Sequence, residues 1–236
     1  MKNPAVCKNC HFENPYYRST CLNCKSYIRD RVYNLDFWKT FAKLLENPFE
    51  AFKLIIFSEQ KNFIFFIMIF AAVKFLINAR FAAMLTLHQF QSGTSLFVSY
   101  ILILACLISA IFFYSYLFTL IGLRFKYQMR IKDNFAILCY SQILSAAALF
   151  VLFPIELILF GDYLFSINPT PFAIKGILAY LLLIIELIVI GWSGFLTYAA
   201  FFSQLKNISA SILSSVLFWF MLTVIVFISS LLIFTL

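Results

Sequence analysis

The sequence has few charged residues: only 12% of its 236 residues are Asp, Glu, Lys or Arg, whereas 63% are hydrophobic. In an ordinary soluble domain about a quarter of the residues are charged and about half are apolar. A globule of this size could not remove so many apolar side chains from water. The composition therefore excludes a disordered chain, a disulfide scaffold and a large soluble enzyme, and it predicts an integral membrane protein.

The common catalytic motifs are also missing. The chain has two histidines, His11 and His88, and no HExxH sequence, which excludes a histidine-rich metal site. It contains no GxSxG, Walker or GxGxxG sequence. Ser and Tyr are plentiful within the apolar stretches, but no plausible base accompanies them. We therefore expect no enzymatic activity.

The charges that are present lie mainly near the N-terminus. Ten of the eighteen Lys and Arg residues, six of the ten acidic residues and four of the six cysteines lie within residues 1–61. A second basic segment is the loop 124–133. Basic residues beside membrane spans usually set the orientation of the chain and contact anionic lipid headgroups. We therefore expect the lipid bilayer, with anionic lipid at the basic loops, to be a partner, and we do not expect nucleic acid.

Five stretches are long and apolar enough to cross a bilayer, which takes roughly 20 residues. They are 62–86, 96–122, 134–160, 173–201 and 210–236. The first is the weakest because charged residues interrupt it, and Pro154 is expected to kink the third. With five spans, every basic segment falls on one side of the membrane if the N-terminus is cytoplasmic and the C-terminus is on the opposite side. Four spans, the alternative, would break this agreement. The sequence thus predicts an all-α protein with a five-helix transmembrane bundle over residues 62–236.

A cysteine-rich segment precedes the bundle. Its spacing is C-x2-C-x10-C-x2-C, formed by Cys7, Cys10, Cys21 and Cys24. Two CxxC turns can place four thiolates around one zinc ion, which would supply folding free energy on the order of 10 kcal/mol. Four thiolates fill the coordination shell and leave no open position for catalysis. We therefore predict a structural zinc ribbon over residues 1–30, with a disulfide pair or bound iron as alternatives, and a solvated His11.

Residues 31–61 connect the ribbon to the bundle. Apolar residues recur there at helical spacing on both sides of Asn47-Pro48. Asn47 can cap a new helix, with Pro48 at its first position and Glu50 at its third. We predict two short amphipathic juxtamembrane helices. They would form a collar either at the membrane surface or packed on the edge of the protein itself.

Charged side chains inside the spans are candidate functional residues, because each costs roughly 2.5–3.5 kcal/mol at the bilayer centre. Lys74 and Glu186 lie near the middle of the first and fourth spans. Arg80 and Glu156 lie toward the outer ends of the first and third spans. Because the depths match in pairs, we expect Lys74–Glu186 and Arg80–Glu156 to be interhelical ion pairs or neighbours in a polar pocket. A structural role is the simpler interpretation, and an ion or substrate path is the alternative.

Residues 46–53 (Glu-Asn-Pro-Phe-Glu-Ala-Phe-Lys) and 133–142 (Asp-Asn-Phe-Ala-Ile-Leu-Cys-Tyr-Ser-Gln), followed by Pro154, resemble segments of the Yip domain. This family comprises the Ypt/Rab-interacting multi-pass membrane proteins and their bacterial relatives. The resemblance covers about residues 44–236 and implies five spans with a cytoplasmic N-terminus. Some bacterial members have a zinc ribbon in front, and the composition favours a bacterial inner membrane, where no Rab partner would be available.

These features predict a non-enzymatic membrane protein that docks a partner or organises the membrane. Its cytoplasmic zinc ribbon would bind a protein partner through exposed residues. The candidate contact residues are Lys8, Phe12, Tyr16 and Tyr17. The alternative is a small transporter or channel that uses intramembrane Lys74, Glu156 and Glu186.

Overall fold

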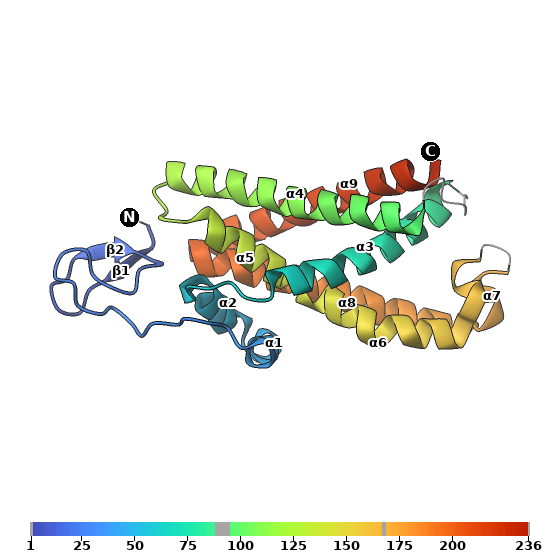
Figure 1. The fold of residues 1–236 in the computed structure, drawn as a ribbon, viewed down its shortest axis with the longest axis horizontal. Helices are drawn as coiled ribbons and strands as arrows, with labels where there is room; N and C mark the ends of the chain where they lie inside the picture. Colours follow the sequence, from blue (N-terminus) through green and yellow to red (C-terminus); the bar gives the residue numbers. More distant parts are fainter. Residues whose placement is uncertain (1, 88–94, 167–168, 236) are drawn as a thin grey trace. The chain divides into compact units, whose positions relative to one another are not determined.

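The computed structural model of the chain describes residues 2–87, 95–166 and 169–235. Within these residues the regular secondary structure is helical apart from one small antiparallel sheet. Strand β1 (Pro4–Val6) pairs with strand β2 (Glu13–Pro15), and Ala5 lies opposite Asn14. Both strands lie near the N-terminus, within the cysteine-rich segment (Figure 1). This segment is therefore a small sheet with two turns and no helix of its own.

The helices follow the sheet in chain order. They are α1 (Phe37–Glu46), α2 (Pro48–Phe57), α3 (Ile64–Leu87), α4 (Leu96–Arg124), α5 (Ile131–Ser141), α6 (Ile143–Phe160), the 3-10 helix η1 (Gly161–Phe165), α7 (Pro171–Ile174), α8 (Gly176–Leu205) and α9 (Ile208–Thr235). In the described part of the chain, five stretches are long and apolar enough to cross a membrane: Ile64–Phe81, Leu96–Arg124, Ile131–Leu164, Gly176–Leu205 and Ile208–Ile233. The chain is a multi-pass integral membrane protein, and the predicted fold class is confirmed.

The third span differs from its prediction. It consists of α5 and α6, separated at Gln142, and Pro154 lies inside α6 rather than at the break. The side chain of Ser141 donates a hydrogen bond to the carbonyl of Leu138 at 2.8 Å. That carbonyl is the acceptor that Gln142 would need to continue the helix, so the serine competes with the backbone. The fourth span also begins later than predicted, at Gly176, and the predicted end of the fifth span, Leu236, lies outside the described residues.

Backbone contacts divide the chain into two compact units. Unit 1 comprises Met1–Phe65, Ile111–Ser141 and Phe195–Leu217, and unit 2 comprises Phe66–Ala110, Gln142–Gly194 and Phe218–Leu236. Only three of the eighteen Lys and Arg residues belong to unit 2: Lys74, Arg80 and Lys175. The basic segments of the sequence are thus gathered in unit 1, together with the cysteine-rich segment.

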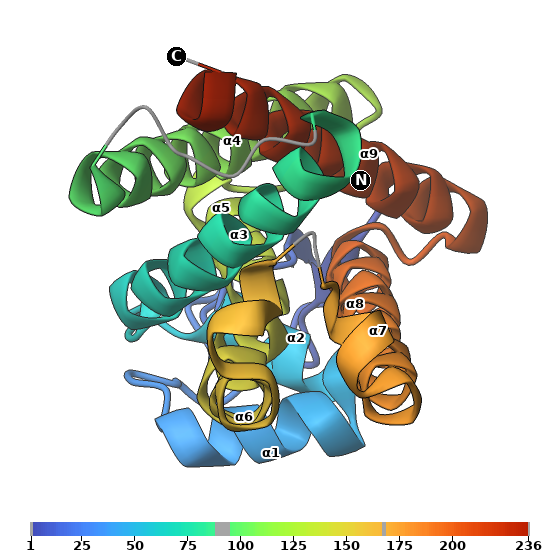
Figure 2. The ribbon, with the colours of Figure 1, turned by 90° about the vertical axis from the view of Figure 1, so that its right-hand side faces the viewer.

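Helix α2 begins at the position that the sequence predicts, and both α1 and α2 have a side-chain cap. The side chain of Asp36 accepts a hydrogen bond from the amide of Lys39 at 2.8 Å and caps α1. Asn47 accepts from the amide of Glu50 at 3.3 Å and caps α2, with Pro48 at the first helical position. The two helices are neighbours in both views (Figure 1, Figure 2). The predicted interruption at Asn47-Pro48 is confirmed.

Helix α2 is packed on the protein within unit 1. It contacts α5, and its buried residues are Pro48, Ala51, Phe52, Ile55 and Ile56. The ring of Phe49 lies 5.5 Å from the ring of Phe202 and 6.2 Å from that of Tyr198, both on α8. For α2, the collar therefore packs on the protein's own edge.

Unit 2 has an apolar core formed by parts of α3, α6, η1 and α8. Its buried members are Phe160, Leu164, Ala179 and Leu182, and Phe81, Phe153, Leu159 and Ile185 pack against them. The rings of Phe70 on α3 and Phe150 on α6 are 4.7 Å apart. These contacts bring α3, α6 and α8 together at the depth where the sequence places its intramembrane charges.

Candidate functional site

The four cysteines of the N-terminal segment meet at one point. Cys7 Sγ is 3.6 Å from Cys24 Sγ, Cys10 Sγ is 3.5 Å from Cys21 Sγ, and all four sulfurs lie within 4.8 Å of one another. A disulfide would need a separation of about 2.05 Å, and the cysteines are free thiols. Four sulfurs around a zinc ion with Zn–S distances of about 2.3 Å would lie roughly 3.8 Å apart. The cluster therefore fits a tetrahedral metal ion.

The two CxxC turns have similar backbone geometry. The residue after each second cysteine, His11 or Lys25, has a positive φ of 55° or 61°. This left-handed residue reverses the chain, so that the amide of Cys7 donates to the carbonyl of Phe12 at 3.1 Å and the amide of Cys21 to that of Ser26 at 2.9 Å. His11 is exposed and is not a member of the cysteine cluster.

Two polar residues that the sequence analysis missed lie against the sulfurs. Ser26 Oγ lies 2.9 Å from Cys24 Sγ and 3.3 Å from Cys7 Sγ, and Asn14 Nδ2 lies 3.5 Å from Cys21 Sγ. The hydrogen bond from Ser26 lowers the pKa of Cys24 to about 6 and also lowers the pKa of Cys7. A lower pKa favours the thiolate, the form that binds metal. Ser26 was detectable in the sequence only as a hydroxyl two residues after Cys24.

The cysteine-rich segment is attached to the rest of unit 1 by buried hydrogen bonds. Asn3 Nδ2 donates to the carbonyl of Gln204 at 3.1 Å, and Asn3 Oδ1 accepts from the amide of Gln128 at 3.0 Å. The amide of Lys2 also donates to the carbonyl of Lys126 at 3.2 Å. Asn3 is 1% exposed, so this attachment excludes water and holds the segment in one orientation.

Aromatic contacts complete the attachment and correct one prediction. The prediction that Tyr16 is an exposed contact residue is wrong: it is buried, and its ring lies 5.2 Å from the ring of Phe57. The guanidinium of Arg29 lies 3.3 Å from the centre of the same Phe57 ring. The ring of half-buried Tyr17 lies 4.1 Å from the guanidinium of Arg130. The aromatic pair Tyr16-Tyr17 thus faces the membrane domain, because its rings are partners for Phe57 and Arg130.

Three charged side chains meet next to Tyr17: Lys61, Arg130 and Asp133, which we call the charged node. Lys61 Nζ is 3.2 Å from Asp133 Oδ1, and Arg130 Nε is 2.7 Å from Asp133 Oδ2. Lys61 Nζ also donates to the carbonyl of Ile56 at 2.9 Å, near the end of α2. Burial lowers the pKa of Lys61 to about 8, although Asp133 opposes this shift. The node joins α2, α5 and the cysteine-rich segment. From the sequence, no pairing between Lys61 in the N-terminal segment and Arg130 or Asp133 in the loop 124–133 was predicted.

A hydrogen-bond network of buried amide side chains lies next to the charged node. Asn134 Nδ2 donates to Thr119 Oγ1 at 2.8 Å, and Gln204 Nε2 donates to Asn134 Oδ1 at 3.0 Å. The carbonyl of Gln204 accepts from Asn3. Within unit 1 this network connects α4, α5, α8 and the cysteine-rich segment. Such satisfied buried networks specify one packing arrangement.

The structure brings together three of the four charged residues predicted inside the spans. In unit 2, Lys74 Nζ on α3 forms an ion pair with Glu186 on α8. Glu156 on α6 is buried and interacts electrostatically with both of them. Its Oε2 atom is buried and has no hydrogen-bond partner within the described residues. The pairing of Arg80 with Glu156 stays a prediction.

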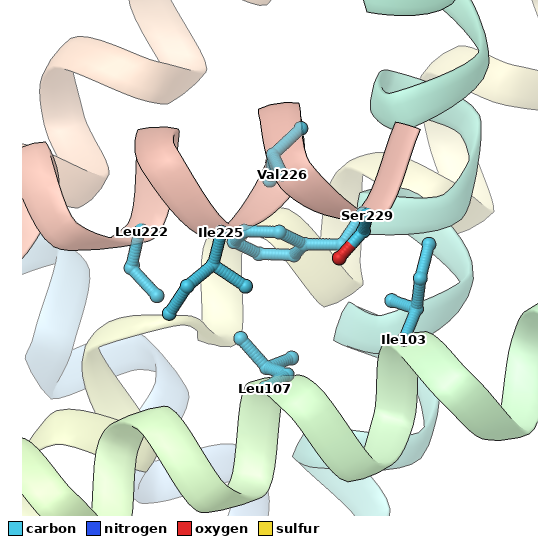
Figure 3. A pocket seen from close by; sticks show the side chains of 7 residues that line it. Ile103, Leu107, Leu222, Ile225, Val226 and Ser229 are labelled. Carbon is cyan, nitrogen blue, oxygen red and sulfur yellow. The ribbon is translucent and has the colours of Figure 1, made fainter. Parts of the chain in front are cut away.

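A small apolar cavity lies elsewhere in unit 2 (Figure 3). Its volume is about 10 Å³, enough for roughly one water molecule. It is lined by Phe75, Ile103, Leu107, Leu222, Ile225, Val226 and Ser229. Ser229 is the single polar residue in this lining, and the cavity does not include Lys74, Glu156 or Glu186. The cavity therefore does not suit a charged substrate.

Comparison with known proteins adds no further information. No protein-family model, no curated protein and no solved structure matches the chain. The functional assignment therefore depends on the cysteine cluster, the surfaces around it and the buried charges.

Proposed function

We propose that the protein is a membrane-embedded docking protein whose zinc ribbon binds a protein partner on the cytoplasmic side. The observation that supports this most directly is the division of the ribbon into two faces. Tyr16 and Tyr17 pack against the rest of unit 1, whereas Phe12 and Leu22 are 44% and 40% exposed. The ribbon is thus held by one face and offers the other to a partner.

The exposed face has a defined shape because one buried side chain organises it. Asn14 Nδ2 donates to the carbonyl of Phe12 at 2.9 Å, and Asn14 Oδ1 accepts from the amide of Leu22 at 2.8 Å. Asn14 therefore links the backbone of Phe12, which follows the first CxxC turn, to the backbone of Leu22 in the second. Lys8 and Lys25 are exposed on the same turns. This docking face, Lys8, Phe12, Leu22 and Lys25, suits a protein segment with apolar side chains flanked by carboxylates.

Zinc is the metal that the ligand set favours. Four cysteine thiolates are typical of structural zinc sites, and they complete a tetrahedral shell. The ion would hold both CxxC turns at the distances described above. The role that follows for the metal is to shape the docking face, with no catalytic step.

The orientation and the membrane are part of the proposal. Fifteen of the eighteen Lys and Arg residues belong to unit 1, which supports a cytoplasmic N-terminus by the positive-inside rule. The C-terminus would then lie on the opposite side. We also propose that the membrane is a bacterial inner membrane and that the protein is a member of the Yip domain family.

The test is crosslinking with mass spectrometry on the full-length protein in its native membrane. Crosslinks from Lys8 and Lys25 to one protein should disappear in a Phe12→Ser/Leu22→Ser variant that still binds zinc. The matched control is Tyr27→Ser, which removes an aromatic side chain of the ribbon that is 70% exposed and lies outside the docking face. If the crosslinks persist in the double variant, or disappear equally in the control, the docking proposal is wrong.

A second candidate function, transport of a small ion, is favoured by one observation. Glu156 has a buried carboxylate oxygen that finds no hydrogen-bond partner among the residues the structure describes, and it interacts electrostatically with the Lys74–Glu186 pair. Ion flux into proteoliposomes should then fail with Glu186→Gln and be unchanged by Phe12→Ser/Leu22→Ser. If the protein is a docking protein, the crosslinks to its partner should instead be lost in Phe12→Ser/Leu22→Ser and be retained in Glu186→Gln.

A further inference from the structure

We propose that α1 is an interfacial helix that inserts one side into the headgroup region of the bilayer and binds anionic lipid through Lys39 and Lys43. The proposal concerns a surface distinct from the docking face of the ribbon. It depends only on the protein being embedded in a membrane, and its test can succeed or fail independently of any protein partner.

The apolar side of α1 is wider than the part that the protein covers. Thr40 and Leu44 are buried, but Trp38 is 75% exposed and Leu45 is 40% exposed. Trp38 and Leu45 are seven residues apart, so they lie on one strip of the helix two turns apart. The exposed strip continues the buried face sideways. An amphipathic helix with an uncovered apolar strip of this kind is typical of helices that lie in the membrane interface.

The beginning of α1 is placed next to the point where the first span begins. The ring of Phe37, the first residue of α1, is 5.3 Å from the ring of Phe63, which directly precedes α3. Phe65 in the first turn of α3 is 80% exposed, as expected for a side chain that faces lipid. The start of α1 is therefore at the depth where the chain enters the hydrocarbon. Trp is enriched at that depth because its ring is amphipathic, and Trp38 follows Phe37 directly.

The charged side of α1 complements an anionic membrane surface. Lys39 and Lys43 are exposed and four residues apart, so they lie one helical turn apart on one side of α1, roughly 100–140° around the helix from Trp38. Their long side chains can extend toward lipid phosphates while the aromatic ring is inserted. Helix α2 differs, since Phe52, Ile55 and Ile56 are fully buried in the protein. The membrane-surface role of the collar thus belongs to α1 alone.

The depth of Trp38 can be measured by fluorescence quenching. The chain has three tryptophans, so a Trp192→Phe/Trp219→Phe variant retains Trp38 alone. In nanodiscs of phosphatidylcholine and phosphatidylglycerol, lipids brominated near the headgroup should quench Trp38 several-fold more than lipids brominated near the chain end. Aqueous iodide should quench it weakly. Strong iodide quenching with no effect of brominated lipid would overturn the proposal.

The wild-type background provides the same test if the double variant does not fold. There, Trp38→Phe should remove the component that headgroup-brominated lipid quenches, and retention of that component would contradict the proposal.

Lipid charge is tested with lysine variants of the protein that retains Trp38 alone. We expect phosphatidylglycerol to increase the quenching of Trp38 by headgroup-brominated lipid relative to pure phosphatidylcholine. Lys39→Glu/Lys43→Glu should abolish this increase. The matched control, Lys8→Glu/Lys25→Glu, makes the same charge change on the ribbon and should retain the increase. The anionic-lipid part of the proposal is wrong if phosphatidylglycerol has no effect, or if both variants lose the effect equally.

Discussion

Lys61 and Asp133 form an ion pair that is almost completely removed from water: the two charged groups are 3.2 Å apart, and the side chains are 3% and 1% exposed. Lys61 follows the end of α2, and Asp133 lies in the first turn of α5. Arg130 also contacts Asp133, so two cations share one carboxylate. Within unit 1, the Asp133 carboxylate therefore holds the segment that follows α2 to the start of α5.

Asp133→Asn should therefore destabilise the protein strongly. Removing one partner of a buried ion pair costs about 3–5 kcal/mol, because the remaining charge is left uncompensated. Thermal unfolding of the solubilised protein, followed by circular dichroism, should show a clearly lower Tm. Adding Lys61→Met removes the buried cation and should recover part of the loss. No recovery in the double variant would show that the two residues are not coupled.

The node should also make stability depend on alkaline pH. Burial lowers the pKa of Lys61 from its ordinary value of 10.5 to about 8. Between these values the unfolded chain binds more protons than the folded chain, so the free energy of unfolding rises as the pH rises from about 8 to 10.5. Below about pH 8 both states hold the proton, and the full penalty of burying the charge, about 3 kcal/mol, is present. Lys61→Met should lose this rise, and an identical pH profile for variant and wild type would contradict the prediction.

Substitution of the cluster cysteines should remove the metal and unfold the ribbon alone. Cys7→Ser or Cys21→Ser should abolish bound zinc, as measured by elemental mass spectrometry, because the metal supplies the folding free energy of such a small segment. Trypsin should then cleave readily after Arg29, whose guanidinium covers Phe57 in the folded ribbon. The helical signal of the spans should remain. Cys106→Ser, outside the cluster, is the control, and equal zinc content in all variants would refute the site.

The intramembrane pair can be tested by a double-mutant cycle. Glu186→Gln and Lys74→Met should each lower stability in nanodiscs, because each removes one partner of an ion pair inside a span. The charge swap Lys74→Glu/Glu186→Lys should be more stable than either single reversal, with a coupling free energy of about 0.5–3 kcal/mol. A swap no better than Lys74→Glu or Glu186→Lys alone would show that the pair contributes nothing.

Local features of the sequence were sufficient for much of the architecture. The spans could be predicted because the bilayer requires long apolar helices, and the break between α1 and α2 because Asn47 and Pro48 act on the backbone of their own turn. The break at Gln142 was missed. It arises from the side chain of Ser141 competing for the carbonyl of Leu138, and serine in an apolar span is normally a packing residue.

The sequence by itself determined the membrane class, the number of spans and the four cysteines that could bind a metal, because apolar length and CxxC spacing act over short stretches of chain. Only the tertiary structure showed that Tyr16 is buried on Phe57, that Lys61 pairs with Asp133, and that α2 is covered while α1 keeps Trp38 exposed. These relationships join residues far apart in the chain. Their partners are selected by packing and by the need to compensate buried charge, and neither requirement is visible in local spacing.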